Sequence, residues 1–166
     1  MGIVHVRIDD RLIHGQVAAM WSSTLKIDRI MVANDKVAVD DMQKAVLRMA
    51  APAGVRTSLI SVEKAAENIK AGKYDAERVF LVLKGPHDAL SLIEHGVKIP
   101  IINVGNMAYK EGMLSVKAQI NLTDQDLEDF KKLDEMGVEL TSILVPDERK
   151  TNLMDLINKA VKKKNK

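Results

Sequence analysis

Short apolar, β-branched runs alternate along this sequence with segments of helical spacing. The runs occupy residues 3–8, 29–33, 55–61, 79–83 and 101–104, and turn-forming or charged residues bound each of them. Runs of this length and composition are typical of strands. The run at 79–83, Val-Phe-Leu-Val-Leu, is apolar throughout, so a strand there needs burial on both faces. The alternation predicts right-handed βαβ crossovers and a parallel sheet covered by helices.

Helical spacing of apolar residues appears between these runs, at 13–21, 39–49, 62–69 and 89–93. We therefore expect a single α/β domain over residues 1–166, with one open, mostly parallel sheet of about seven strands and helices on both faces. The remaining elements expected from the same patterns are weaker strands at 118–122 and 138–144, a helix at 123–136 that opens on a Thr-Asp-Gln-Asp cap, and a last helix at 152–164.

Composition excludes several classes of function. The 25 Lys and Arg nearly balance 23 Asp and Glu, and the chain has only one Trp, two Tyr and two Phe, so we expect no nucleic-acid binding. It has no cysteine, which excludes disulfides and thiolate chemistry. The apolar run at 79–83 is far shorter than the roughly 20 residues of a membrane helix, and the N-terminus lacks a signal-peptide pattern. We expect a cytoplasmic protein without a membrane span.

A dense polar cluster follows the first expected strand, at the sheet edge where open α/β folds bind ligands. Within eight residues it contains Arg7, Asp9, Asp10, Arg11 and His14. If a helix begins within this stretch or directly after it, His14 meets free backbone N–H groups and the positive end of the helix dipole. This field disfavours imidazolium and favours an attached anion. Those properties suit a histidine that attacks phosphorus and carries a phosphoryl group.

Two charged neighbours complement this hypothesis. Arg11 offers a planar fork for two phosphate oxygens, and Asp9 either orients the imidazole or restrains Arg11. The alternative is purely structural. In that interpretation Asp10 caps the helix, Asp9 and Arg11 form a surface ion pair, and the histidine is incidental. The other histidines have structural interpretations: His5 on the first strand, His87 in a turn at the same sheet edge, and His95 at a helix C-terminus.

A second candidate phosphate site follows the fifth expected strand. Gly105 and Asn106 allow a positive-φ turn whose backbone N–H groups bind phosphate oxygens. The sequence has no Gly-rich Lys-Ser/Thr loop, no Gly-x-Gly-x-x-Gly, no His-Glu-x-x-His and no Gly-x-Ser-x-Gly. We therefore expect no nucleotide cofactor and no catalytic metal.

The loop at 7–17, Arg-Ile-Asp-Asp-Arg-Leu-Ile-His-Gly-Gln-Val, resembles the signature of the IIB components of the mannose/fructose/sorbose family of the bacterial phosphoenolpyruvate-dependent sugar phosphotransferase system. The likeness continues in the family's order and spacing over essentially the whole chain. The other matching segments are 50–55 (Ala-Ala-Pro-Ala-Gly-Val), 61–65 (Ser-Val-Glu-Lys-Ala), the turn Gly96-Val97, and Asn103-Val104-Gly105 with Met107.

This resemblance implies a phosphoryl relay. A phosphohistidine IIA protein or domain donates to Nδ1 of His14, which passes the group to a sugar bound in the membrane IIC and IID components. Carried over by position, His14 is the nucleophile, Arg11 stabilises the phosphoryl oxygens, and Asp9 is the supporting carboxylate. The protein would then be cytoplasmic and associated peripherally with the membrane transporter. The phosphate-binding residues expected are Gly15, Gln16, Gly105, Asn106 and Lys84.

Two positions depart from the family pattern. Asn106 stands where a second glycine is usual, and Lys84-Gly85-Pro86 replaces a triplet such as Thr-Asn-Pro. Asn tolerates positive φ better than most residues, and Lys84 adds a cationic contact for phosphate or a partner. Two other functions stay open: a regulatory module that senses phosphorylation without delivering it to sugar, and an α/β domain that binds a small molecule with no covalent step.

Overall fold

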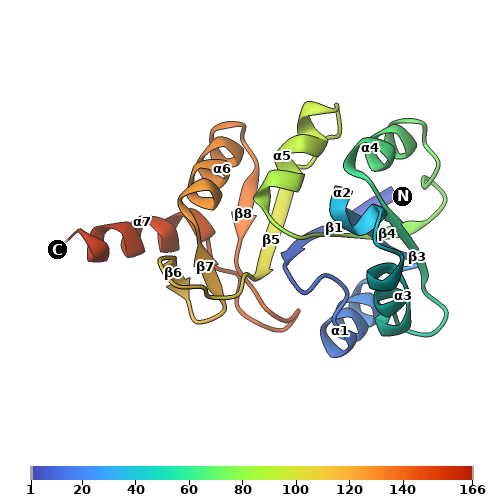
Figure 1. Ribbon diagram of the computed structural model, residues 1–166, viewed down its shortest axis with the longest axis horizontal. Helices are drawn as coiled ribbons and strands as arrows, with labels where there is room; N and C mark the ends of the chain where they lie inside the picture. Colours follow the sequence, from blue (N-terminus) through green and yellow to red (C-terminus); the bar gives the residue numbers. More distant parts are fainter. Residues whose placement is uncertain (1, 166) are drawn as a thin grey trace.

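A six-stranded parallel sheet forms the centre of the protein (Figure 1). The computed structural model describes residues 2–165. All neighbouring strands of this sheet pair in parallel, which confirms the predicted open α/β architecture. In spatial order the strands are β3 (Arg56–Ile60), β2 (Arg29–Ala33), β4 (Arg78–Leu83), β1 (Gly2–Asp9), β5 (Ile101–Asn106) and β8 (Glu139–Thr141).

The strand expected at 118–122 does not join this sheet. The structure places it in a separate antiparallel hairpin of β6 (Leu114–Lys117) and β7 (Ile120–Leu122). Only two residues separate the two strands, and such a short connection permits antiparallel pairing alone, since a parallel crossover needs a dozen or more residues. The placement of 118–122 in the main sheet is therefore a wrong prediction, and the sheet has six strands rather than about seven.

Helices cover both faces of the sheet, as predicted (Figure 1). Along β4, Phe80 and Val82 belong to one apolar cluster, whereas Val79, Leu81 and Leu83 belong to the other, because successive strand residues point to opposite faces. The first cluster includes residues of α1 (Gly15–Leu25), α2 (Asp35–Ala38) and α3 (Asp41–Ala50). The second includes residues of α4 (Val62–Lys70), α5 (Pro86–Glu94), α6 (Asp124–Glu135) and α7 (Leu153–Lys164).

Side chains cap most of these helices, but not α1 or α5. The predicted Thr123–Asp126 capping box opens α6, and Asn34, Asp40, Ser61 and Asn152 cap other helices. The residues that precede α1 and α5 make no such bond. Within residues 2–165, no helix is long and apolar enough to cross a membrane.

The strand order locates the ligand-binding edge of the sheet. Strand β1 lies between β4 and β5, and α1 follows it on one face, while α5 leaves β4 for the other face. The connection that follows β1 and the one that follows β4 therefore lead to opposite faces of the sheet, beside the carboxyl end of β1. This is a topological switch point, where open α/β sheets bind ligands.

Candidate functional site

A short loop joins β1 to α1 at this edge. Leu12 and Ile13 are both 4% exposed and anchor the loop in the apolar cluster under α1. Leu12 has φ +62°, a left-handed conformation that side-chain-bearing residues rarely adopt, and its N–H donates to the carbonyl of Asp9 at 2.9 Å. Burial of its two apolar residues holds the loop in this conformation.

His14 follows these residues and is exposed to solvent. It is the N-cap residue of α1, next to the first turn of a helix that begins within the expected stretch, and its carbonyl accepts the N–H of Ala18 at 2.8 Å. Its imidazole caps no backbone N–H and has no hydrogen-bond partner in the described part of the chain. Gly15 and Gln16, also exposed, begin an 11-residue helix. The imidazole is therefore accessible beside the free N–H groups at the start of a helix.

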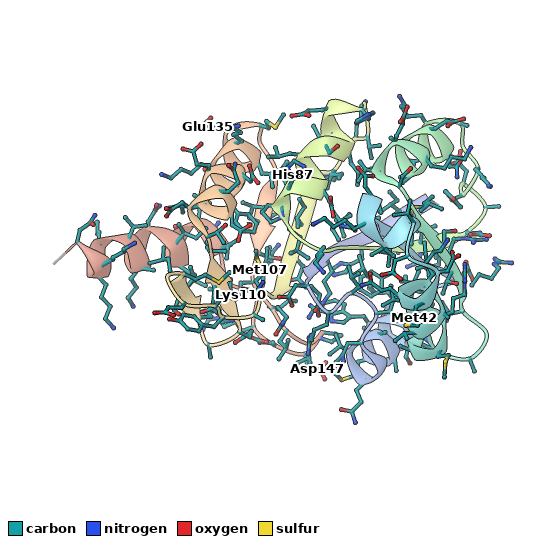
Figure 2. All side chains as sticks on the ribbon, in the orientation of Figure 1. Met42, His87, Met107, Lys110, Glu135 and Asp147 are labelled. Carbon is teal, nitrogen blue, oxygen red and sulfur yellow. The ribbon has the colours of Figure 1, made fainter. Side chains whose placement is uncertain are left out.

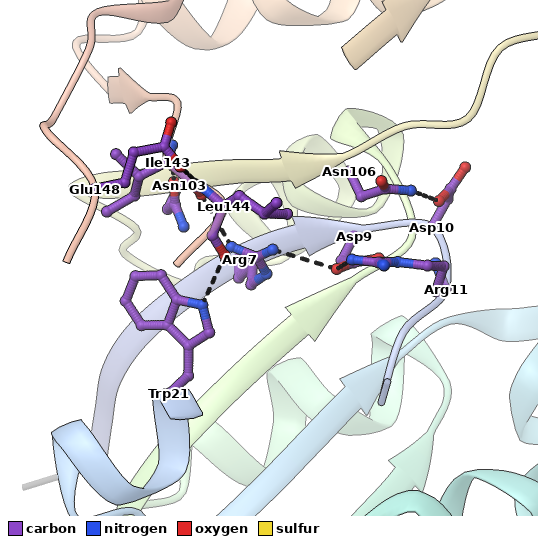
Figure 3. A network of polar contacts seen from close by, with 10 residues as sticks. All are labelled: Arg7, Asp9, Asp10, Arg11, Trp21, Asn103, Asn106, Ile143, Leu144 and Glu148. Atoms are coloured by element: carbon purple, nitrogen blue, oxygen red, sulfur yellow. Dashed lines mark hydrogen bonds and ion pairs between the residues drawn. The ribbon is translucent and has the colours of Figure 1, made fainter. Parts of the chain in front are cut away.

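Asp9 restrains Arg11. The Arg11 Nε donates to Asp9 Oδ1 at 2.9 Å and Nη2 donates to Oδ2 at 2.8 Å, while the Arg11 backbone N–H donates to Oδ1 at 3.0 Å (Figure 3). The hydrogen bond to Asp9 raises the pKa of Arg11. Asp9 is 1% exposed and the Arg11 side chain 34%, so this is a half-buried pair rather than the surface pair of the structural alternative. No hydrogen bond joins Asp9 to His14 among the described residues, so of its two expected roles this structure shows the restraint of Arg11.

Asp10 joins this loop to β5 and does not cap α1. Its Oδ1 accepts from Asn106 Nδ2 at 2.8 Å, and its Oδ2 accepts the Ala108 N–H at 2.7 Å. Its own N–H donates to the Asn106 carbonyl at 3.0 Å. The structural alternative is therefore wrong in its cap, because Asn106 and Ala108, at and just after the end of β5, bind the two carboxylate oxygens of Asp10.

The positive-φ turn expected at Gly105 and Asn106 is also absent. Both residues belong to β5, and neither has a positive φ. Asn106 pairs with Asp9 in the parallel ladder to β1, which extends the backbone there. Gly105 instead allows the Arg7 guanidinium to lie against the backbone of β5, because a Cβ at this position would overlap that group. Phosphate binding by these two residues stays a prediction that this backbone does not favour.

Arg7 belongs to the polar cluster that the sequence singled out, but sequence reasoning gave it no role in the site. It is 1% exposed within β1, where Nη1 donates to the Ile143 carbonyl at 3.1 Å and Nη2 to Asp9 Oδ2 at 3.3 Å (Figure 3). Its guanidinium carbon lies 5.5 Å from the centroid of the Trp21 ring. Burial lowers the pKa of Arg7, and Asp9 opposes this shift. The available signal was a charged residue inside a strand expected to be covered on both faces, where a charge needs a partner.

Lys84 lies on the other side of the switch point. It lines a cleft of about 450 Å³ together with Asp10, His87 and Lys110, whereas His14 is not among the lining residues. Figure 2 labels His87 and Lys110. Its side chain is exposed and makes no ion pair within residues 2–165. Contact of Lys84 with a phosphoryl group on His14 stays a prediction. In the described part of the chain, no group of three or more His, Asp or Glu side chains is placed to hold a metal ion.

His5 packs between β1 and α1, in keeping with its expected structural role. Its ring stacks on Trp21 with centroids 4.5 Å apart and also contacts Phe80 at 5.4 Å. Burial, followed by the charge of Arg7, lowers the pKa of His5 to about 4. The neutral ring is therefore the form that the folded protein favours.

This shift predicts a pH dependence of stability. Because the folded pKa lies below the unfolded value of 6.5, the stabilisation is present above pH 6.5 and is lost as the pH falls towards 4. The free energy of unfolding should fall by about 3 kcal/mol over this window through His5 alone. Urea unfolding between pH 7 and pH 4 checks this, with His5→Phe as the variant that keeps the stacking but cannot titrate. Parallel pH profiles for the two proteins would contradict it.

A comparison with models of known protein families shows to which family this chain belongs. The model of the family described as "PTS system sorbose subfamily IIB component" matches residues 3–166. The chain belongs to this family of IIB components. The predicted resemblance is thereby confirmed. Membership supports a phosphocarrier role in sugar uptake, within the general class of transferases.

Individual relatives of this IIB component agree with the assignment. The sorbose-specific EIIB component of Klebsiella pneumoniae is 39% identical over 158 residues, which cover 95% of this chain and 96% of the relative. The mannose-specific EIIAB component of Escherichia coli K12 is 42% identical over 153 residues, 92% of this chain but only 47% of the relative. The crystal structure of the IIBSor domain of the Klebsiella pneumoniae sorbose permease matches with a TM-score of 0.90 and 38% identity, and covers 96% and 98% of the two chains.

Proposed function

We propose that this IIB component accepts a phosphoryl group on His14 from a phosphohistidine IIA protein and passes it to a sugar bound in membrane IIC and IID components. The observation that supports this most is the exposed, unbonded imidazole at the uncapped start of α1. Two different proteins have to reach the same nitrogen in turn, and an imidazole on the protein surface meets that requirement. The name EIIAB of the Escherichia coli relative joins IIA and IIB in one chain, which supports IIA as the donor.

Each step of the proposed relay breaks one bond to phosphorus and forms another. In the first step the Nδ1 lone pair of neutral His14 attacks the phosphorus of the donor phosphohistidine. The new N–P bond forms as the donor's N–P bond breaks, and the donor ring keeps that electron pair. In the second step a sugar hydroxyl oxygen attacks the same phosphorus, the bond to His14 breaks, and the hydroxyl proton passes to a base at the sugar site. The backbone N–H groups of Gly15 and Gln16, the first two residues of α1 after His14, are the proposed donors for the phosphoryl oxygens.

The phosphoryl group carries two negative charges, and Arg11 is the cation proposed to meet them. Its guanidinium is half-buried and now pairs with Asp9 through two side-chain hydrogen bonds, while Nη1 has no bond to the described residues. A guanidinium fork can bridge two phosphoryl oxygens, which spreads the charge that develops during transfer. Catalysis of phosphoryl transfer consists mainly of such positioning and charge stabilisation.

We expect Arg11→Lys to slow phosphorylation by about tenfold or more, although the charge is kept. An ammonium group is a point charge and cannot make two parallel hydrogen bonds to one phosphoryl group. The rate of label transfer from phosphorylated IIA measures this, with Arg48→Lys on the exposed face of α3 as the control. Equal rates for Arg11→Lys and the wild-type protein would remove the bidentate role.

The proposal is tested by following labelled phosphate from phosphoenolpyruvate. The protein is incubated with the general phosphotransferase proteins and a cognate IIA protein, and the label should be labile to acid and stable to base. Peptide mapping should then find it on His14. Label on another residue, or no label, would contradict the proposal.

Delivery to sugar is tested separately, because a sensing module would also become phosphorylated. Membranes that contain the cognate IIC and IID components and the transported sugar are added to the phosphorylated protein. Loss of label from His14 with formation of sugar phosphate supports the relay. Retention of the label would favour the regulatory alternative.

A further inference from the structure

We infer that Arg7 is a positioning residue that balances the buried charge of Asp9, so that Arg11 can leave Asp9 and bind the phosphoryl group on His14. This inference rests on the proposed function, because it concerns how that reaction is prepared. It assigns a role to a residue that does not itself reach the reacting atoms.

The starting observation is one carboxylate shared by two guanidinium groups. Asp9 Oδ2 accepts from Arg11 Nη2 at 2.8 Å and from Arg7 Nη2 at 3.3 Å, while Oδ1 accepts from Arg11 alone (Figure 3). The cluster therefore holds two positive charges and one negative charge. Two further carboxylates act on it, Asp10 on Arg11 and Glu148 on Arg7, close to the loop that carries His14.

The two arginines differ in their freedom to move. The Arg7 side chain extends from β1 over β5, where the missing side chain of Gly105 makes room for its guanidinium. The Trp21 ring lies on it, and the Ile143 carbonyl accepts its second hydrogen bond. Those neighbours are themselves fixed, because Trp21 Nε1 donates to the Leu144 carbonyl at 3.2 Å and the Ile143 N–H donates to a side chain of β5 at 3.0 Å. Arg7 cannot turn towards solvent without disrupting this packing.

Arg11 has a different environment. Its side chain is 34% exposed, and both of its hydrogen bonds go to Asp9. Water can therefore replace much of the hydrogen bonding that the guanidinium loses when it rotates away from Asp9. Rotation of the Arg11 side chain away from Asp9 breaks two bonds to one partner, and the backbone N–H of Arg11 can keep its bond to Asp9 Oδ1.

The role of Arg7 follows from the buried carboxylate of Asp9, which would lose one of its counter-charges when Arg11 moves away. Asp9 is 1% exposed, and a buried carboxylate without a counter-charge is strongly unfavourable. With Arg7 in place, Asp9 keeps a guanidinium partner when Arg11 departs. Without Arg7, Arg11 would be the only counter-charge of Asp9 and would be held there. Arg7 thereby makes the charge of Arg11 available to phosphate.

The decisive test is a double-variant cycle. Arg7→Met should slow transfer from phosphorylated IIA by about tenfold or more, because Arg11 stays on Asp9. Adding Asp9→Asn should restore most of that rate, because a neutral amide needs no counter-charge. If Arg7 serves structure alone, the double variant should be as slow as Arg7→Met or slower, and that result would overturn the inference. Arg29→Met controls for the loss of an arginine–carboxylate ion pair outside the site, because Arg29 bonds Glu77 through Nε at 2.6 Å and Nη2 at 3.0 Å.

A measurement on the wild-type chain keeps the inference testable if Arg7→Met does not fold. Nitrogen NMR resolves the Nε–H groups of arginines, and phosphorylation should shift the Arg11 resonance while those of Arg7 and Arg29 stay in place. An unchanged Arg11 resonance in protein that is phosphorylated on His14 would overturn the inference but leave the proposed function intact. Absence of phosphate on His14 would instead overturn the proposed function.

Discussion

His14→Ala should reduce phosphorylation by the donor protein to background, a loss on the order of 10³-fold or more. The imidazole is the group expected to form the bond to phosphorus, and alanine offers no nucleophile in its place. The substitution should leave the fold intact, because the side chain is exposed, caps no helix N–H and has no hydrogen-bond partner in the described chain. Incorporation of labelled phosphate, with a thermal melt beside it, measures both effects.

A matched control is available at the same edge of the sheet. His87 is also exposed, and it lies in the first turn of α5, which like α1 has no side-chain cap. His87→Ala should therefore keep the wild-type level of label. If His87→Ala loses the label and His14→Ala keeps it, the phosphoryl acceptor has been assigned to the wrong histidine.

Gly105→Ala should lower the free energy of unfolding by about 3 kcal/mol, which corresponds to a melting temperature about 10 °C lower for a chain of this size. The added Cβ would occupy the space of the Arg7 guanidinium, and the nearest atom it meets belongs to that group. Arg7 would have to withdraw from Asp9, Ile143 and the Trp21 ring together, and a displaced buried charge is costly. Thermal or urea unfolding measures the effect directly.

Gly15→Ala is the opposite case and serves as the control. No atom lies within 4 Å of a Cβ built at Gly15, and the residue is in the first turn of α1. Alanine should stabilise the helix there by about 0.5–1 kcal/mol, because glycine loses more conformational freedom on folding. A Gly105→Ala protein as stable as the wild type would show that the Arg7 guanidinium does not pack on β5.

The parts of the fold that sequence predicted are those set by local pattern. Alternating apolar runs and helical spacing locate the strands of the main sheet, because burial on both faces leaves a strong signal in each run. The hairpin at 114–122 was not predicted, since β6 has only four residues and its pairing depends on a two-residue turn. The helix expected over 39–49 is present as α3, whereas the short α2 before it was not predicted, because Asn34 and Asp40 each cap a separate start.

The site divides in the same way. The position of His14 at a helix start could be predicted, since it depends only on the residues around it. The contacts of Arg7 with Gly105 and of Asp10 with Asn106 could not, because about 100 residues separate the partners and only the order of β1 and β5 brings them together. The prediction of a positive-φ turn at Gly105 was wrong for this reason. The sequence does not reveal whether a glycine is needed for a turn or for the close packing of another group against the backbone.

The left-handed backbone of Leu12 has a thermodynamic consequence for association. A flexible loop would lose conformational entropy each time a partner docked on it, and that loss would weaken every encounter. Here Leu12 and Ile13 are already buried, so folding has ordered the loop before any partner arrives. A carrier in the proposed relay would bind one protein to receive the phosphoryl group and another to release it. Each of the two complexes then forms without the entropic cost of ordering the loop.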